Sequence, residues 1–112
     1  MTQASLAFAI PTRNRADMAM NAVRHLLDQQ NCELQIFVSD NSSNEEEVRK
    51  LAGFCRELNA PRLTYMRPPD RDLSQGRHWD WASREALRRS NASHVTVHYD
   101  RKIFRPGQAA FL

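Results

Sequence analysis

The sequence predicts an α/β fold whose parallel sheet is covered by helices on both faces. Two near-continuous apolar runs, SLAFAI at residues 5–10 and LQIFVS at residues 34–39, are typical of strands buried on both sides. Segments with apolar residues at helical spacing lie between and after these runs. The resulting order is βαβαβαβ without an internal repeat, which favours right-handed crossovers and a doubly wound parallel sheet.

Helices are expected on either side of the second strand. Apolar residues recur at helical spacing from Ala16 to about Gln30, which predicts the first crossover helix. Ser43 is expected to cap the second helix in a capping box with Glu46. Acidic residues 45–47 suit the positive end of that helix. Its apolar stripe is expected to contain Val48, Leu51, Ala52, Cys55 and Leu58.

The second half of the chain supplies two shorter strands and a third helix. LTYM at residues 63–66 predicts a strand, and the two prolines after it predict an irregular loop. Ser74 is expected to cap the third helix, and HVTVHY at residues 94–99 to form the fourth strand. The buried face of this helix is expected to carry Trp79, Ala82, Ser83, Ala86 and Leu87. Trp79 and Trp81 are interpreted as structural, with stacking on a base or sugar as the alternative.

The bulk composition favours one cytoplasmic domain. A chain of 112 residues suffices for a single compact core, so residues 1–112 are taken as one domain. LAFAI has no basic n-region before it and arginines soon after it, so it fits neither a signal peptide nor a membrane span, and we predict a cytoplasmic protein. Cys32 and Cys55 follow no metal or redox spacing and are expected to be reduced core residues.

The charge of the chain is weak support for a nucleic-acid partner. The net charge is only +3 at pH 7, and the arginines are spread along the chain. A small polyanionic ligand suits this balance equally well. We therefore predict no nucleic-acid partner; the alternative of an RNA- or DNA-binding domain predicts steeply salt-dependent binding.

Polar segments directly follow three of the predicted strands. They are PTRNR at residues 11–15, SDNSS at residues 39–43 and HYDRK at residues 98–102. Parallel α/β sheets bind ligands beyond the carboxyl ends of their strands. The sequence therefore predicts one shared ligand site at this edge of the sheet.

The motifs resemble those of the family 2 glycosyltransferases. The resemblance rests on FAIPTRNRADMAMNAVRHLLDQ, LQIFVSDNSSNEE, SQGRHWDWASREAL and HVTVHYDRKIFRPG, and it runs from about Leu6 to Gly107. It implies the nucleotide-binding half of a Rossmann-like GT-A fold, and an enzyme that transfers a sugar from a nucleotide-sugar donor, expected to be a UDP-sugar. The alternative is a non-catalytic nucleotide-binding or regulatory module on the same scaffold.

The resemblance also implies a set of nucleotide-sugar-binding residues. The loop after the first strand would cradle the nucleoside through Pro11, Thr12, Arg13 and Asn14. Asp40 would pair with the base, since a carboxylate accepts the imide N–H of uracil; alternatively it caps the turn with Asn41 and Ser42. Gly76 and Arg77 would lie beside the base and phosphates, although Arg77 fits a surface charge equally well.

The family's metal-binding D-x-D triplet is incomplete in this sequence. In HYDRK only Asp100 is acidic, so Asp100, with His98 as a weaker candidate, is the expected site for Mg²⁺ or Mn²⁺. His98 is more readily interpreted as a half-buried strand residue. Alternatively, Arg101 and Lys102 neutralise the departing diphosphate without a metal, or the motif has decayed and the protein binds a nucleotide without turnover.

The half of the family that carries the acceptor site and the catalytic base is expected beyond Leu112. The chain is therefore expected to be truncated before its acceptor half, with an unknown acceptor and no transferase activity on its own. A sheet that lacks its later strands would leave an edge uncovered, which predicts self-association.

Overall fold

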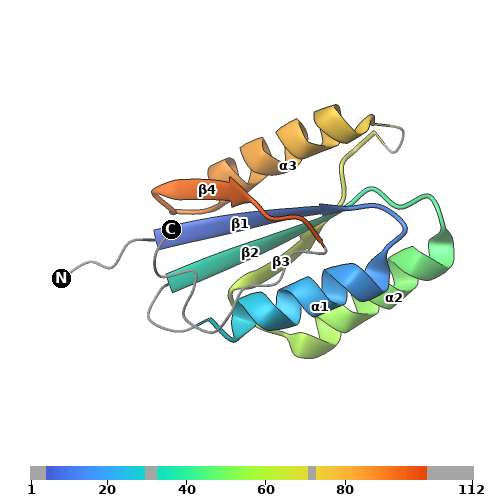
Figure 1. Cartoon of the computed structure of the whole chain (residues 1–112), viewed down its shortest axis with the longest axis horizontal. Helices are drawn as coiled ribbons and strands as arrows, with labels where there is room; N and C mark the ends of the chain where they lie inside the picture. Colours follow the sequence, from blue (N-terminus) through green and yellow to red (C-terminus); the bar gives the residue numbers. More distant parts are fainter. Residues whose placement is uncertain (1–4, 30–32, 71–72, 101–112) are drawn as a thin grey trace.

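In the described part of the chain, four strands and three helices alternate. Figure 1 shows their arrangement. This computed structural model describes residues 5–29, 33–70 and 73–100. The strands are β1 (Ser5–Thr12), β2 (Glu33–Asp40), β3 (Leu63–Met66) and β4 (His94–Val97). The helices are α1 (Ala16–Leu27), α2 (Glu45–Leu58) and α3 (Gln75–Arg89).

The strands form one parallel sheet in the order β3-β2-β1-β4. In Figure 1, α1 and α2 lie on one face of the sheet and α3 lies on the other. The doubly wound α/β fold predicted from the sequence is therefore confirmed. Thr12 pairs in register with Asp40, so β1 and β2 end together at the same edge.

Each face of the sheet has its own apolar core. Side chains alternate along β1, so Phe8 and Ile10 face α1 and α2, whereas Ala7 and Ala9 face α3. The first core also contains Val23, Leu26, Leu34, Ile36, Val38 and Leu51. The second core is made largely of small residues, because Ala82 and Ala86 of α3 lie against the alanines of β1. Burial on both faces explains the continuous apolar runs in the sequence.

Several predicted boundaries and one cap differ from the structure. α1 ends at Leu27 rather than near Gln30, which lies outside the described residues, and β4 ends at Val97 rather than Tyr99. The predicted Ser43 cap of α2 is wrong, because Asn44 is the N-cap and its side chain accepts hydrogen bonds from the backbone N–H of Glu46 and Glu47. The predicted N-cap of α3, Ser74, is confirmed, and so are the predicted bounds of β3.

The predicted buried face of α3 is only partly correct. Ala82 and Ala86 are fully buried, but Leu87 is 59% exposed and Trp79 only half-buried. The buried stripe instead begins at His78, one turn before Ala82. The helix is thus rotated so that a polar residue, rather than a tryptophan, enters the protein where α3 begins.

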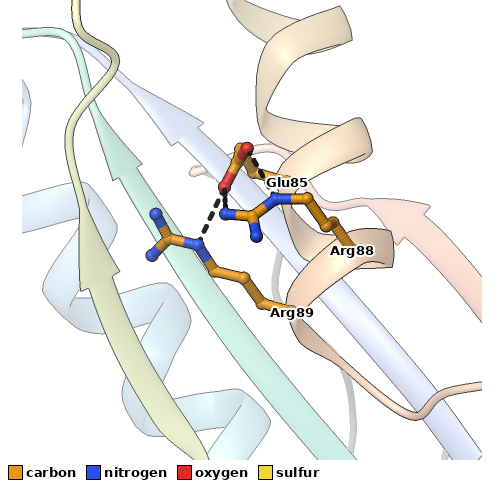
Figure 2. Close-up of polar contacts among 3 residues, drawn as sticks. All are labelled: Glu85, Arg88 and Arg89. Carbon is orange, nitrogen blue, oxygen red and sulfur yellow. Dashed lines mark hydrogen bonds and ion pairs between the residues drawn. The ribbon is translucent and has the colours of Figure 1, made fainter.

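The last turns of α3 carry a cluster of charged side chains (Figure 2). Glu85 lies between two arginines and accepts hydrogen bonds from Arg88 Nη2 and Arg89 Nε, each at 2.8 Å. These donors lower the pKa of the Glu85 carboxyl. Both arginines are solvent-exposed, so water and salt screen these pairs and they contribute little to the stability of the helix.

Cys55 is a buried free thiol in the first core, as predicted. Burial raises the pKa of this thiol to about 11, with a smaller contribution from the charge of Asp40. The thiol is therefore protonated at neutral pH and acts as core filler. Cys32 lies outside the described residues.

Two further sequence predictions concern the surroundings of the chain. Among the described residues, none of the helices combines the length and apolar character needed to cross a membrane. β3 and β4 are the edge strands of the described sheet. Self-association through an uncovered edge stays a prediction.

Candidate functional site

A pocket of about 320 Å³ opens where β1 and β2 end and α3 begins. It therefore lies at the sheet edge where the sequence places the ligand site. Pro11, Thr12, Arg13 and Arg15 line it from the first segment, and Asn41 from the end of β2. Leu73, Gln75, His78 and Trp79 form the wall on the α3 side. Two arginines thus face neutral amide, imidazole and apolar groups across one cavity.

Asp100 joins the end of β1 to the segment after β4. Thr12 Oγ1 donates a hydrogen bond to Asp100 Oδ2 at 3.0 Å, across 88 positions of sequence. Arg15 Nε forms an ion pair with the same oxygen, also at 3.0 Å. The Asp100 side chain is only 3% exposed, whereas that of Arg15 is 44% exposed. Two of the predicted site residues, Thr12 and Asp100, are therefore brought together, with Arg15 as an additional partner.

Asp40 is fully buried at the end of β2 and does not line the pocket. Its Oδ1 accepts the backbone N–H of Ser42 at 2.9 Å, and its Oδ2 accepts the Tyr65 hydroxyl at 2.7 Å. Burial, followed by this hydrogen bond to the carboxylate, raises the pKa of Tyr65. The carboxylate thus makes the turn-capping bond of the alternative interpretation, while its pairing with a base stays a prediction.

Asn14 fastens the loop after β1 to the loop after β2. Its backbone φ is +54°, in the left-handed region that asparagine tolerates better than most residues. Its side-chain oxygen accepts the backbone N–H groups of Ser43 and Asn44, and its Nδ2 donates to Ser43 Oγ. Asn14 therefore shapes the site without lining the pocket.

Arginines at both sides hold the loop that follows β2. Arg13 lines the pocket and donates through Nη1 to the carbonyl oxygen of Asn41 at 3.2 Å. From the other side, Arg67 donates to the carbonyl oxygens of Asp40 and Ser42. These bonds fix the backbone around Asn41, whose Nδ2 donates to the carbonyl oxygen of Leu73.

The remaining predicted residues lie outside the pocket wall. Gly76 and Arg77 are exposed in the first turn of α3, and a Cβ at Gly76 would meet no atom within 4 Å. Close packing within this chain therefore does not require a glycine there. His98 is 1% exposed and packs edge-on against Phe8, with ring centroids 5.7 Å apart. The roles of Gly76, Arg77 and His98 in ligand binding stay predictions.

Five pocket residues were not assigned to the site from the sequence: Arg15, Asn41, Leu73, Gln75 and His78. Arg15 is part of the PTRNR motif and Asn41 part of SDNSS, so both had a local signal. His78 had none, because a histidine at helical spacing does not reveal which face it occupies. Trp79 also lines the pocket and packs against Tyr99, with ring centroids 4.9 Å apart.

His78 is a buried polar residue at the base of the α3 wall. Its Nε2 lies 2.8 Å from Ser39 Oγ, and the side chain is 4% exposed. Burial, as the largest cause, lowers the pKa of His78 below its ordinary value of 6.5. The imidazole is therefore neutral at physiological pH and presents hydrogen-bonding groups rather than charge.

This lowered pKa predicts a pH-dependent stability. Between the folded-state pKa and about 6.5, the unfolded chain binds more protons than the folded one. The free energy of unfolding should therefore decrease as pH falls from 7 through this window. Urea unfolding measured across that pH range should show that the free energy of unfolding depends less on pH in His78→Gln than in the wild type. An equal pH dependence in the two proteins would assign the effect to other groups.

The residues present fit a divalent cation poorly. Within residues 5–29, 33–70 and 73–100, no three His, Cys, Asp or Glu side chains come together as a metal site. Asp100, which contacts the pocket residues Thr12 and Arg15, receives both of these contacts on Oδ2, one of them from a guanidinium. Mg²⁺ and Mn²⁺ favour carboxylate oxygens that no fixed cation already occupies.

The topology is that of a doubly wound α/β domain with its pocket at the carboxyl ends of the strands. The sequence model described as "Glycosyl transferase family 2" matches residues 7–92, which is most of the chain. The chain belongs to glycosyl transferase family 2. A search of curated proteins found no match.

A solved structure shares this fold. It is a mannosyltransferase from Pyrobaculum calidifontis, PcManGT, in complex with GDP-Man and Mn²⁺, with a TM-score of 0.71 and 16% sequence identity. The match covers 96% of this chain and 30% of the mannosyltransferase. The present chain thus corresponds to less than a third of that protein's length.

Proposed function

We propose that this chain is the donor-binding half of a glycosyltransferase and that its pocket binds a nucleoside diphosphate sugar. The observation that carries the proposal is the pocket at the ends of β1 and β2, lined by Thr12, Arg13 and Arg15 of the family motif. The arginines supply positive charge for a diphosphate. The neutral wall containing Asn41 and His78 suits a nucleobase, which needs hydrogen bonds without net charge.

The reaction proposed for the complete protein is transfer of the sugar to an acceptor hydroxyl. The hydroxyl oxygen forms a bond to the anomeric carbon, while the bond from that carbon to the diphosphate oxygen breaks. The nucleoside diphosphate leaves with the bonding electrons, and a general base takes the hydroxyl proton. Arginines beside the leaving group stabilise the charge that develops on it. No carboxylate lines the described pocket, so we assign the base and the acceptor site to the acceptor half of the protein.

The donor proposed from the family resemblance is a UDP-sugar, and GDP-mannose is the natural comparison because PcManGT was solved with it. Calorimetric titration with UDP, GDP, UDP-glucose and GDP-mannose tests the proposal directly. We expect saturable binding of at least one nucleoside diphosphate and of the corresponding nucleotide-sugar. Absence of binding by all four ligands to the folded chain would refute it.

A matched pair of variants separates the pocket from general charge. Arg13→Gln removes a pocket cation, whereas Arg84→Gln removes an exposed arginine that pairs with Asp80 on α3. Binding should weaken about tenfold in the first variant, as expected for a lost charge-assisted hydrogen bond, and stay unchanged in the second. Equal losses in both would indicate nonspecific attraction of the anionic ligand.

A second candidate is a nucleotide-binding module without turnover. The observation that favours it is that Asp100, the one acid of the HYDRK segment, is already bound by Thr12 and Arg15. Both candidates predict binding, but only the first predicts release of nucleoside diphosphate from a nucleotide-sugar when the complete protein and an acceptor are present.

A further inference from the structure

The ion pair between Arg15 and Asp100 occupies the position where the family resemblance places a divalent cation. Arg15 Nε lies 3.0 Å from Asp100 Oδ2, and Thr12 Oγ1 donates to the same oxygen at 3.0 Å. The carboxylate is 3% exposed, so solvent screens this pair less than a surface pair. A fixed positive charge therefore already neutralises the acid that would otherwise attract a metal ion.

Within the described part of the chain, most of the hydrogen-bonding capacity of Arg15 is unused. A guanidinium has five N–H donors, and Nε accounts for one of them. Among residues 5–29, 33–70 and 73–100, this guanidinium pairs with Asp100. The four N–H groups of the two terminal nitrogens have the planar arrangement that binds two phosphate oxygens at once.

The position of Arg15 on the chain supports the same role. It is the N-cap of α1, but its side chain makes no capping hydrogen bond. The side chain instead lines the pocket and is 44% exposed, so a ligand in the pocket can reach it. Arg13, which also lines the pocket, adds a second positive charge.

We propose that Arg15 is the resident cation of this site, held by Asp100 and Thr12, and that it binds the diphosphate without a divalent metal. This inference rests on the proposed nucleotide-binding function. A metal ion approaching Asp100 would meet the guanidinium at the carboxylate and be repelled by it. Arg15 thus neutralises the negative charge of the diphosphate. A GT-A site with two or more acids would use a metal ion for this.

The inference predicts that metal dependence appears only when Arg15 is removed. Calorimetric titration with UDP and GDP would be performed on the wild type, Arg15→Gln and Arg15→Lys, each in EDTA and in Mn²⁺. For whichever nucleotide binds, the wild-type affinity should agree within about threefold between the two conditions. Arg15→Gln should lose about tenfold or more in EDTA, because a charge-assisted contact is lost.

Mn²⁺ should restore part of the affinity of Arg15→Gln, since Asp100 is then free to bind the ion. Arg15→Lys keeps the charge but not the planar fork, so it should stay metal-independent with a smaller loss. If thermal unfolding shows that Arg15→Gln is not folded, Arg15→Lys still tests the contact between Arg15 and the diphosphate. The matched control is Arg84→Gln, an arginine of α3 outside the pocket.

The contrary results are distinct. Wild-type binding that requires Mn²⁺ and is lost in EDTA would overturn the role of Arg15 while leaving the proposed function intact. Metal-independent binding that survives unchanged in Arg15→Gln would also overturn it. Absence of nucleotide binding in both conditions would instead contradict the proposed function itself.

Discussion

Replacing Asp40 with alanine should lower the free energy of unfolding by about 3 kcal/mol, one of the largest effects of any substitution at the sheet edge. The side chain is fully buried and accepts hydrogen bonds from Ser42 N–H and the Tyr65 hydroxyl. Alanine would leave the buried Ser42 N–H and the part-buried Tyr65 hydroxyl without this acceptor. A buried donor without an acceptor costs about 1–3 kcal/mol, and a part-buried one less. Urea unfolding followed by circular dichroism measures the change.

Two milder variants show whether these hydrogen bonds are the cause. Asp40→Asn retains an acceptor oxygen for Ser42, and Tyr65→Phe removes only the phenolic donor. Each should cost less than Asp40→Ala, and the double variant Asp40→Asn/Tyr65→Phe should cost less than the sum of its parts. A stable Asp40→Ala protein that has lost nucleotide binding would instead favour the base-binding role of Asp40.

Replacing Ala82 with leucine should destabilise the chain by about 2–3 kcal/mol and abolish nucleotide binding. Ala82 is fully buried where α3 lies against the small side chains of β1, Ala7 and Ala9. A leucine does not fit there unless α3 moves away from the sheet. Because α3 also carries His78 and Trp79, that movement would open the pocket wall. Unfolding and calorimetric titration of the same protein measure both effects.

Leu87→Ala provides the control on the same helix. Leu87 is 59% exposed, so its truncation should change the free energy of unfolding by no more than about 0.5 kcal/mol and leave binding intact. If Ala82→Leu were as stable as the wild type and bound nucleotide normally, the close packing of α3 on β1 would not position the pocket.

The sheet was predictable because its strands are buried on both faces. This burial produces continuous apolar runs, and the crossover helices between them determine a parallel arrangement. The bounds of β3 and the Ser74 cap of α3 also followed from local chemistry. Such features depend on neighbours in sequence, which the sequence displays directly.

The incorrect predictions involve contacts between distant segments. Ser43 looked like the cap of α2, but its hydroxyl accepts from Asn14, 29 positions earlier, and Asn44 takes the cap instead. Local spacing likewise predicted that Leu87 lies on the buried face of α3. In the structure Leu87 is exposed, and His78 lies on the face that packs against β1. Helical periodicity alone allows either rotation when both faces carry apolar residues.

The sequence indicated where a pocket would form, but not the contacts within it. Three polar strand ends predicted a site at the edge of the sheet where the pocket lies, and Thr12 meets Asp100 there. No local pattern indicates that Arg15 completes this pair or that Tyr65 engages Asp40. Ion pairs and buried hydrogen bonds of this kind are determined by how the strands are placed side by side.

The most direct test of the central claim is a map of amide chemical-shift changes on the ¹⁵N-labelled chain during titration with UDP-glucose or GDP-mannose. We predict that the largest changes cluster at Thr12, Arg15, Asn41, Leu73 and His78, which line the pocket. Changes confined to the opposite edge of the sheet, around Arg62 and Arg89, or no changes at saturating ligand, would contradict a nucleotide-sugar site at the ends of β1 and β2.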